Sequence, residues 1–209
     1  MAASKNTKTK LLDAAEELFN EHGFERTSTR AIALAAGTNS AAPNFHFGSK
    51  AELYRAVFER RMKPLVAQRM ELIQTLTRGT NTPDVDVFVD SAVLPLIDMM
   101  KRGDKGEMAF LGLLAKSTVG NNETLRSLLT QELQSYTESY FSMVQAALPH
   151  LERDEVILRI VYMMGVISHA FSDTSRRPMF GASEKAYNPD YIYRTMKRFL
   201  VAGLKAPAS

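Results

Sequence analysis

The sequence of 209 residues predicts an all-α protein. Apolar residues recur at spacings of three and four along most of the chain, and no sustained alternation of apolar and polar residues indicates a strand. Glycine, proline and asparagine interrupt these apolar rows where helices are expected to end. We therefore expect a three-helix N-terminal domain over residues 1–50 and a larger helical domain over residues 51–209, joined by a helix that starts at about residue 50.

The N-terminal part has the pattern of a helix-turn-helix. A first amphipathic helix is expected over residues 8–23, with Gly23 as its C-cap. Any of residues 27–29, TST, can cap a short second helix over residues 30–36. A tight turn with a glycine then leads into the third helix, within residues 40–47. Two short helices joined in this way predict a helix-turn-helix.

Beyond this motif every segment is expected to be helical. Ser49 can cap the next helix, with Glu52 at the position that completes a capping box, and Pro64 is expected to kink this helix. A loop follows over residues 77–84. Further helices are expected near residues 84–101, 105–118, 121–147, 152–175 and 189–204.

Basic charge is concentrated at the N-terminal end. Residues 1–70 contain 11 lysines and arginines and 7 acidic residues, whereas the remainder contains 15 and 16. This distribution suits phosphate binding by the N-terminal domain alone. No window approaches the roughly 18 apolar residues that a membrane span needs, and the N-terminus lacks the apolar core of a signal peptide. We expect a cytoplasmic protein with no membrane partner.

Catalytic and cofactor motifs are missing from the sequence. The four histidines show no HExxH spacing, there is no cysteine, and the GxSxG, P-loop and GxGxxG patterns do not occur. We therefore expect no enzymatic activity, no cofactor and no metal site. The helix-turn-helix pattern instead indicates a DNA-binding regulator, which is either a repressor or an activator. A ligand- or protein-binding helical module whose helix-turn-helix does not read DNA stays open as an alternative.

Residues 10–53, KLLDAAEELFNEHGFERTSTRAIALAAGTNSAAPNFHFGSKAEL, resemble the DNA-binding domain of the TetR, or tetracycline-repressor, family. AAEELFNEHGF, TSTRAIALAAG and HFGSKAEL carry the resemblance. It implies a ligand-responsive repressor that binds palindromic double-stranded operator DNA as a homodimer. The C-terminal domain would bind the inducer and dimerise through the helices near 152–175 and 189–204. Members with a motif similar to NxHFGSK often sense fatty acids, acyl thioesters or other apolar molecules.

The resemblance places the second helix of the motif in the major groove, with phosphate contacts on either side. Arg30 has the chemistry to read guanine or to hold a phosphate, and Ala41 and Ala42 are small enough to meet thymine methyl groups. Hydroxyl and ammonium groups supply the phosphate contacts. The expected DNA contacts are Ser28, Thr29, Arg30, Ser40, Ala41, Ala42, Asn44, Phe45, His46 and Lys50.

Two positions in the third helix depart from the family pattern. Pro43 and Asn44 stand where the family usually has an apolar residue and a tyrosine. Pro43 is acceptable only in a first helical turn, so it either fixes the start of the helix close to Ser40 or removes a backbone hydrogen bond. Asn44 can pair with adenine or a phosphate. For residues 45–47, FHF, the alternative is packing against the first helix.

The C-terminal domain is rich in methionine and aromatic residues, which suit an adaptable apolar pocket but equally fill a core. The absence of tryptophan argues against a cage for cationic drugs, so we expect a small apolar ligand such as a fatty acyl compound. The expected ligand contacts are Met99, Met108, Phe110, Leu111, Leu114, Tyr140, Phe141, Met163, Ile167 and Phe171. An anionic head group would meet Lys101, Arg102, Lys105, Arg176 or Arg177, for which solvated surface is the alternative.

Overall fold

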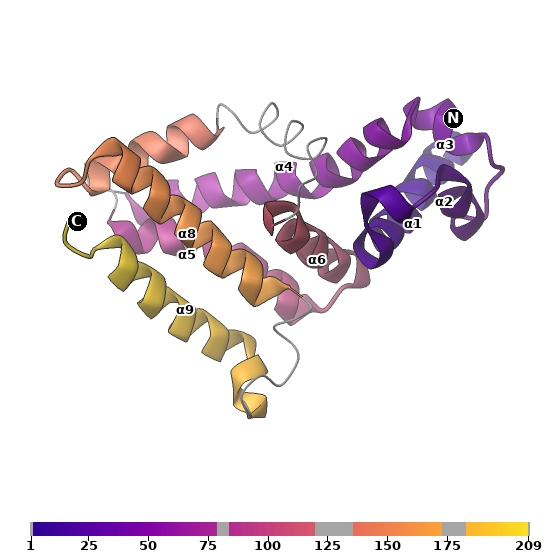
Figure 1. The fold of residues 1–209 in the computed structure, drawn as a ribbon. Helices are drawn as coiled ribbons and strands as arrows, with labels where there is room; N and C mark the ends of the chain where they lie inside the picture. The colour runs from indigo at the N-terminus through magenta and orange to yellow at the C-terminus, as the bar shows by residue number, and fades with distance from the viewer. Residues whose placement is uncertain (1, 79–83, 120–135, 173–182, 209) are drawn as a thin grey trace.

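The computed structural model describes residues 2–78, 84–119, 136–172 and 183–208, and over these ranges the chain is helical with no strand. This confirms the predicted all-α fold (Figure 1). The bounds lie close to those expected for most helices, although the first helix begins six residues earlier than expected. Of the helix expected over residues 121–147, residues 121–135 lie outside the described residues. The helices are α1 (Ala2–Arg26), α2 (Thr29–Ala35), α3 (Ala42–Phe47), α4 (Lys50–Leu76), α5 (Val85–Arg102), α6 (Lys105–Val119), residues 136–147, α8 (Arg153–Phe171), the 3₁₀-helix η3 (Glu184–Tyr187) and α9 (Pro189–Leu204).

The helices form two lobes that α4 connects. Helices α1, α2 and α3 cluster at one end, and the long α4 runs from this cluster along the length of the molecule (Figure 1). Helix α5 packs against α4 and α9, whereas α6 packs against both α1 and α8. Helix α6 therefore lies between the N-terminal lobe and the C-terminal helices. No helix in the described part of the chain is long and apolar enough to cross a membrane.

Local sequence signals explain where the N-terminal helices begin and end. Gly23 has a φ of 79°, which interrupts the regular part of α1 at the predicted C-cap position. The N–H of Ala31 donates to Ser28 Oγ at 3.1 Å, so Ser28 caps α2. The N–H of Glu52 donates to Ser49 Oγ at 3.1 Å, so the predicted cap of α4 is present.

The two prolines that the sequence singled out behave differently. Pro43 lies in the first turn of α3, where its missing N–H leaves no bond unmade, and the helix starts at Ala42 as proline requires. Pro64 lies inside α4, which continues unbroken from Lys50 to Leu76. The proline therefore does not end the helix, and the kink expected at Pro64 stays a prediction.

A row of aromatic rings runs from the N-terminal lobe into the C-terminal one. Phe19 of α1 meets Tyr54 of α4 edge to face at 4.7 Å, and Tyr54 meets Phe58 at 5.2 Å. Phe58 in turn contacts Phe110 of α6 at 6.2 Å. All four side chains are at most 3% exposed, and burial raises the pKa of Tyr54 to about 12. The core is therefore continuous across the domain boundary expected near residue 50.

Candidate DNA interface and ligand hollow

The turn between α2 and α3 is fixed by local hydrogen bonds. Gly37 adopts a φ of 62°, which favours glycine. The backbone N–H and the hydroxyl of Thr38 donate to the carbonyl of Ala33 at 2.9 and 3.2 Å. Asn39 Oδ1 accepts from the N–H of Ala41 at 3.1 Å, just before α3 starts. The turn thus holds α3 at a defined angle to α2, as a helix-turn-helix needs.

Most of the side chains predicted to contact DNA lie on the surface of this motif. The exposed set is Ser28, Arg30, Ser40, Ala41, Asn44 and Phe45, while Thr29 and His46 are half-buried. Phe45 is 84% exposed. Ala42 needs correction, because its side chain is only 6% exposed and belongs to the core of the lobe. A buried methyl group of this kind does not reach a thymine.

Lys50 has partners within the protein that the sequence did not reveal. Its Nζ donates to the carbonyls of Phe24 at 3.0 Å, of Thr27 at 3.2 Å and of Glu25 at 3.5 Å. It also lies 4.3 Å from the centre of the Phe24 ring. Lys50 therefore satisfies the carbonyls at the end of α1. Contact with a phosphate stays a prediction, in competition with these bonds.

A buried carboxylate joins the N-terminal lobe to α4. Glu16 of α1 is 1% exposed, and its Oε2 accepts from Arg60 at 2.5 Å and from Arg61 at 3.0 Å. Its Oε1 accepts from Arg61 Nε, also at 3.0 Å. Arg60 additionally pairs with Asp13 at 2.6 Å. We call Glu16, Arg60 and Arg61 the interlobe ion cluster. The sequence analysis missed it, because Glu16 and the two arginines are more than forty residues apart.

Two glycines let α6 lie close to α1. A Cβ added at Gly106 would overlap the guanidinium of Arg61, and one added at Gly112 would overlap the amide of Asn20. Glu16 and Asn20 are one turn apart on α1, so both glycines face the same region of the N-terminal lobe. The absence of a side chain at these positions therefore brings α6 into direct contact with the interlobe ion cluster.

A hollow of about 550 Å³ lies where the α5–α6 corner meets the ends of α8 and α9. Its size falls in the range typical of small-molecule sites, and its lining is almost entirely apolar. The lining residues are Met100, Gly103, Met108, Leu111, Ala170, Phe171, Ala186, Tyr187, Pro189 and Ile192. Because Met108 and Leu111 belong to α6, one helix borders both this hollow and the N-terminal lobe.

Comparison with known proteins decides the family. Residues 11–57 match the family described as "Bacterial regulatory proteins, tetR family", and residues 90–203, more than half of the chain, match "Tetracyclin repressor-like, C-terminal domain". The chain belongs to the TetR family. This is a family of DNA-binding regulators and not of enzymes.

Individual relatives of this TetR-family chain are distant. An uncharacterized HTH-type transcriptional regulator, TtgW of Pseudomonas putida, is 36% identical over 64 residues, which are 31% of this chain and 48% of that protein. The chain thus spans about half the length of the curated relative it matches.

Solved structures agree with the fold over nearly the whole chain. NalD, a repressor of a multidrug efflux pump in Pseudomonas aeruginosa, has a TM-score of 0.62 at 21% identity, covering 96% of this chain and 97% of its own. The fatty acid degradation regulator FadR from Bacillus halodurans has a TM-score of 0.65 at 15% identity, covering 95% of this chain and 96% of its own. SmeT, solved as a complex with triclosan, has a TM-score of 0.60 at 21% identity, covering 96% of this chain and 95% of its own.

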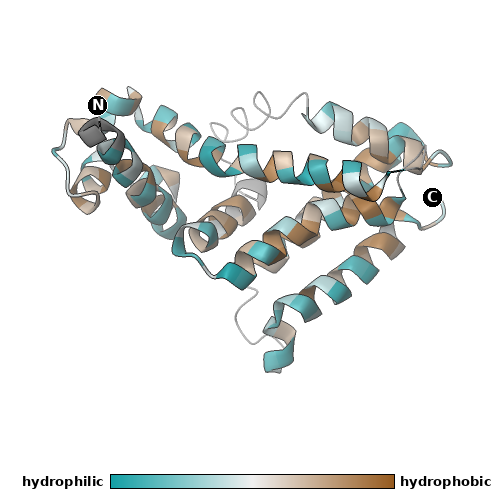
Figure 2. Cartoon of the chain, turned by 180° about the vertical axis from the view of Figure 1, so that it is seen from behind, coloured by the Kyte–Doolittle hydropathy of each residue, from teal (hydrophilic) through white to brown (hydrophobic). Residues whose placement is uncertain are grey.

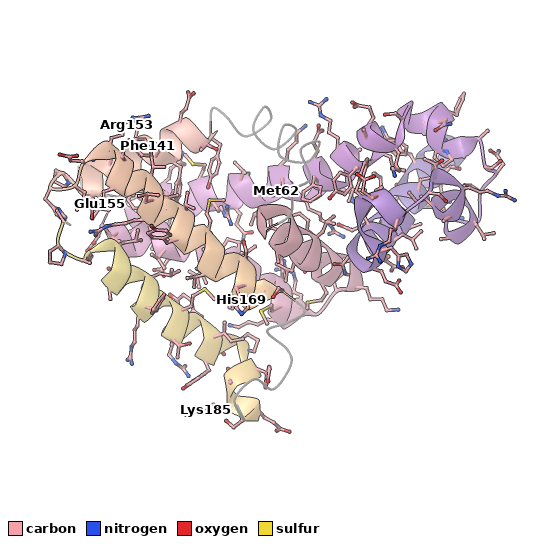
Figure 3. All side chains as sticks on the ribbon, in the orientation of Figure 1. Met62, Phe141, Arg153, Glu155, His169 and Lys185 are labelled. Carbon is pink, nitrogen blue, oxygen red and sulfur yellow. The ribbon has the colours of Figure 1, made fainter. Side chains whose placement is uncertain are left out.

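In this TetR-family chain the predicted ligand contacts separate into two groups. Met108, Leu111 and Phe171 line the hollow. The others pack in or against the core: Met99, Phe110, Tyr140, Met163 and Ile167 are buried, and Leu114 and Phe141 are partly buried. Figure 3 shows Phe141 beside Arg153 at the end of the molecule far from the N-terminal lobe, with the guanidinium 4.5 Å from the ring centre.

The basic residues proposed for an anionic head group are mostly paired. Lys101 bonds Asp190 at 2.6 Å, which ties the end of α5 to the start of α9, and Arg102 bonds Glu107 at 2.8 Å. The hydrogen bond from Lys101 lowers the pKa of Asp190. Lys105 is exposed, and residues 176 and 177 lie outside the described ranges.

Helices α8 and α9 of the TetR-family chain carry exposed apolar side chains. Figure 2 shows apolar residues recurring among hydrophilic ones along α9. On α8, Leu158, Val161 and Tyr162 are 49%, 53% and 64% exposed, and they share one face by their spacing. Gly165 continues this face, and Phe199 of α9 is 66% exposed. An exposed apolar row of the kind that α8 carries is typical of a protein interface.

Proposed function

We propose that this chain is a transcriptional repressor that binds palindromic operator DNA as a homodimer and releases it when a small apolar ligand fills the hollow. Acyl chains of fatty acids or acyl thioesters are the favoured ligand class. The proposal rests on one observation above all: α6 supplies Met108 and Leu111 to the hollow, and its glycines contact the N-terminal lobe.

DNA binding by the N-terminal lobe is supported by shape and by charge. Helix α3 is short and exposed, and α2 places Arg30 on the surface beside it. Residues 1–70 carry the surplus of basic charge, which attracts phosphate groups. One six-residue helix offers too few contacts for useful affinity alone, so two lobes must act together on two half-sites.

Dimerisation is proposed through α8 and α9. Their exposed face, which includes Leu158, Val161, Tyr162 and Phe199, would pack against the same face of a second copy, since twofold interfaces are self-complementary. Two helices from each subunit then form a four-helix interface. This arrangement would leave the N-terminal lobes free to approach DNA, with recognition helices about 34–36 Å apart.

The apolar lining of the hollow supports the choice of ligand class. Two methionines and a phenylalanine among its residues can adapt to flexible hydrocarbon chains. The NxHFGSK-type motif favours the same class, and two structural neighbours are a fatty acid degradation regulator and a complex with triclosan, an apolar compound. Lys101 lies next to the lining residue Met100 but is already paired with Asp190, so a carboxylate head group would have to displace this partner.

The proposal makes a thermodynamic demand. A ligand shifts the dimer between a DNA-binding state and a released state only by the difference in its affinity for these two states. The coupling is reciprocal, so operator DNA must weaken ligand binding by the same factor by which the ligand weakens DNA binding. Purified full-length protein is titrated with fatty acids, acyl thioesters and a cationic dye, with and without operator DNA. We expect an apolar compound to bind, with a coupling of about 5-fold to 150-fold. Tight binding of the dye alone, or equal ligand affinity in both titrations, overturns the proposal.

A pair of variants locates the ligand. Met108→Ala should lower ligand affinity and leave DNA affinity without ligand unchanged, because Met108 lines the hollow. Met70→Ala is the matched control, since Met70 of α4 is partly buried against the core and does not line the hollow. An equal effect of both substitutions would show that the ligand binds elsewhere.

A further inference from the structure

Helix α3 and the residue before it expose an apolar surface on the helix-turn-helix. Phe45 is 84% exposed, and its N–H donates to the carbonyl of Ala41 at 2.9 Å, so these two exposed residues are one turn apart on the same face. Together with Gly37, Thr38 and His46 they border an open hollow of about 490 Å³. A large aromatic side chain left in water in this way indicates a surface that a partner covers.

The composition of α3 restricts which bases it can read. Its sequence, APNFHF, contains no arginine or lysine to pair with guanine O6 and N7, and no aspartate or glutamate to accept from cytosine N4. Asn44 is exposed and suits adenine, because adenine N7 accepts from the side-chain amide and adenine N6 donates to its oxygen. Thymine is the one base that offers a methyl group in the major groove, and an apolar side chain is the group that contacts it.

We propose that Phe45, with Ala41, reads the C5 methyl group of a thymine in each half-site of the operator. This inference rests on the proposed function, because it assumes that α3 enters the major groove. The basic charge of the N-terminal residues supplies affinity for the phosphates, and the apolar pair supplies base preference. Phe45 is thus a specificity-determining residue, and the operator has A·T pairs opposite α3.

The test removes one methyl group at a time. Wild-type protein selects binding sites from a pool of random duplexes, and each thymine of the selected site is then replaced by deoxyuridine. We expect one position in each half-site at which loss of the methyl group weakens binding about fourfold, and about 15-fold when both half-sites are changed. Replacement at other thymines should change affinity less than twofold.

Variants then assign the methyl contact to Phe45. Phe45→Ala should weaken binding to the thymine site, so that this variant binds the thymine and deoxyuridine sites with equal affinity. Phe45→Leu should keep part of the preference for thymine over deoxyuridine. Leu34→Ala is the matched control: Leu34 is 82% exposed on α2, and its loss should leave the discrimination intact. Circular dichroism of each variant confirms that the lobe is folded.

The outcomes separate the inference from the function on which it rests. If no duplex is selected, the proposed DNA binding fails, and the inference fails with it. If a site is selected but wild-type protein binds deoxyuridine and thymine alike at every position, or Phe45→Ala still discriminates between them, DNA binding stands and the reading by Phe45 is overturned.

Discussion

Removal of the buried charge at Glu16 should destabilise the junction between the lobes. Glu16→Gln keeps the shape of the side chain but replaces a carboxylate that accepts three hydrogen bonds from Arg60 and Arg61. Breaking a buried ion pair from one side costs about 3–5 kcal/mol. The two arginine side chains are 24% and 25% exposed, so water compensates part of the loss. We expect a decrease of about 2–3 kcal/mol in the free energy of unfolding.

Urea and thermal unfolding measure this decrease, and the midpoint temperature should fall by about 4–12 °C for a chain of this size. Glu17→Gln is the matched control, because Glu17 is the exposed neighbour of Glu16 on α1 and its loss should change stability by less than about 0.5 kcal/mol. If both variants are equally stable, the ion cluster makes no net contribution, and the reasoning from burial is wrong.

Three further perturbations test other parts of the structure. Lys50→Met should lower the free energy of unfolding by about 1–2 kcal/mol, because it removes charge-assisted bonds to carbonyls at the end of α1. Unchanged stability would contradict this capping role. If the salt dependence of DNA binding also falls by about one unit of slope, Lys50 contacts a phosphate as well. Arg159→Met should lower the free energy of unfolding in urea by about 3 kcal/mol. The Arg159 side chain is 10% exposed and donates to Glu155 and to the carbonyls of Leu204, Ala206 and Pro207, so it anchors the C-terminal residues. Proteolysis of these residues should accelerate in the variant, and a wild-type cleavage rate would argue against this anchoring. Phe199→Glu should shift the proposed dimer toward monomer at micromolar concentration in analytical ultracentrifugation, because it places a charge in the exposed apolar face. An unchanged sedimentation profile would exclude this part of α9 from the interface.

Much of the fold could be predicted because the signals that define it are local. The positive φ of Gly23, the caps at Ser28 and Ser49 and the first-turn position of Pro43 all depend on residues within one turn of each other. The same locality made the helix-turn-helix recognisable. Pro64 shows the limit of such signals, since α4 continues through it to Leu76 although an interior proline disfavours a helix.

The functional residues could be predicted less completely, because burial and pairing arise between distant segments. Ala41 and Ala42 are identical in sequence, yet only the structure shows that one faces solvent and the other the core. Lys50 finds its acceptors 23 to 26 residues away. The methionine and aromatic content of the C-terminal domain could not distinguish Met108, which lines a hollow, from Met163, which fills the core.

The position of α6 connects the apolar hollow with the interlobe ion cluster. A packed interior does not deform continuously, so a helix in contact on two sides transmits a displacement instead of absorbing it. Gly106 and Gly112 contribute no side chain of their own where α6 meets Arg61 and Asn20, so α6 lies directly against these two residues. Under the proposed function, we expect a ligand that displaces Met108 to move α6 and thereby to shift α1 or to strain the bonds between Glu16 and its arginines. Either response would change the orientation of the lobe that carries α3, and DNA and ligand would then compete through one helix.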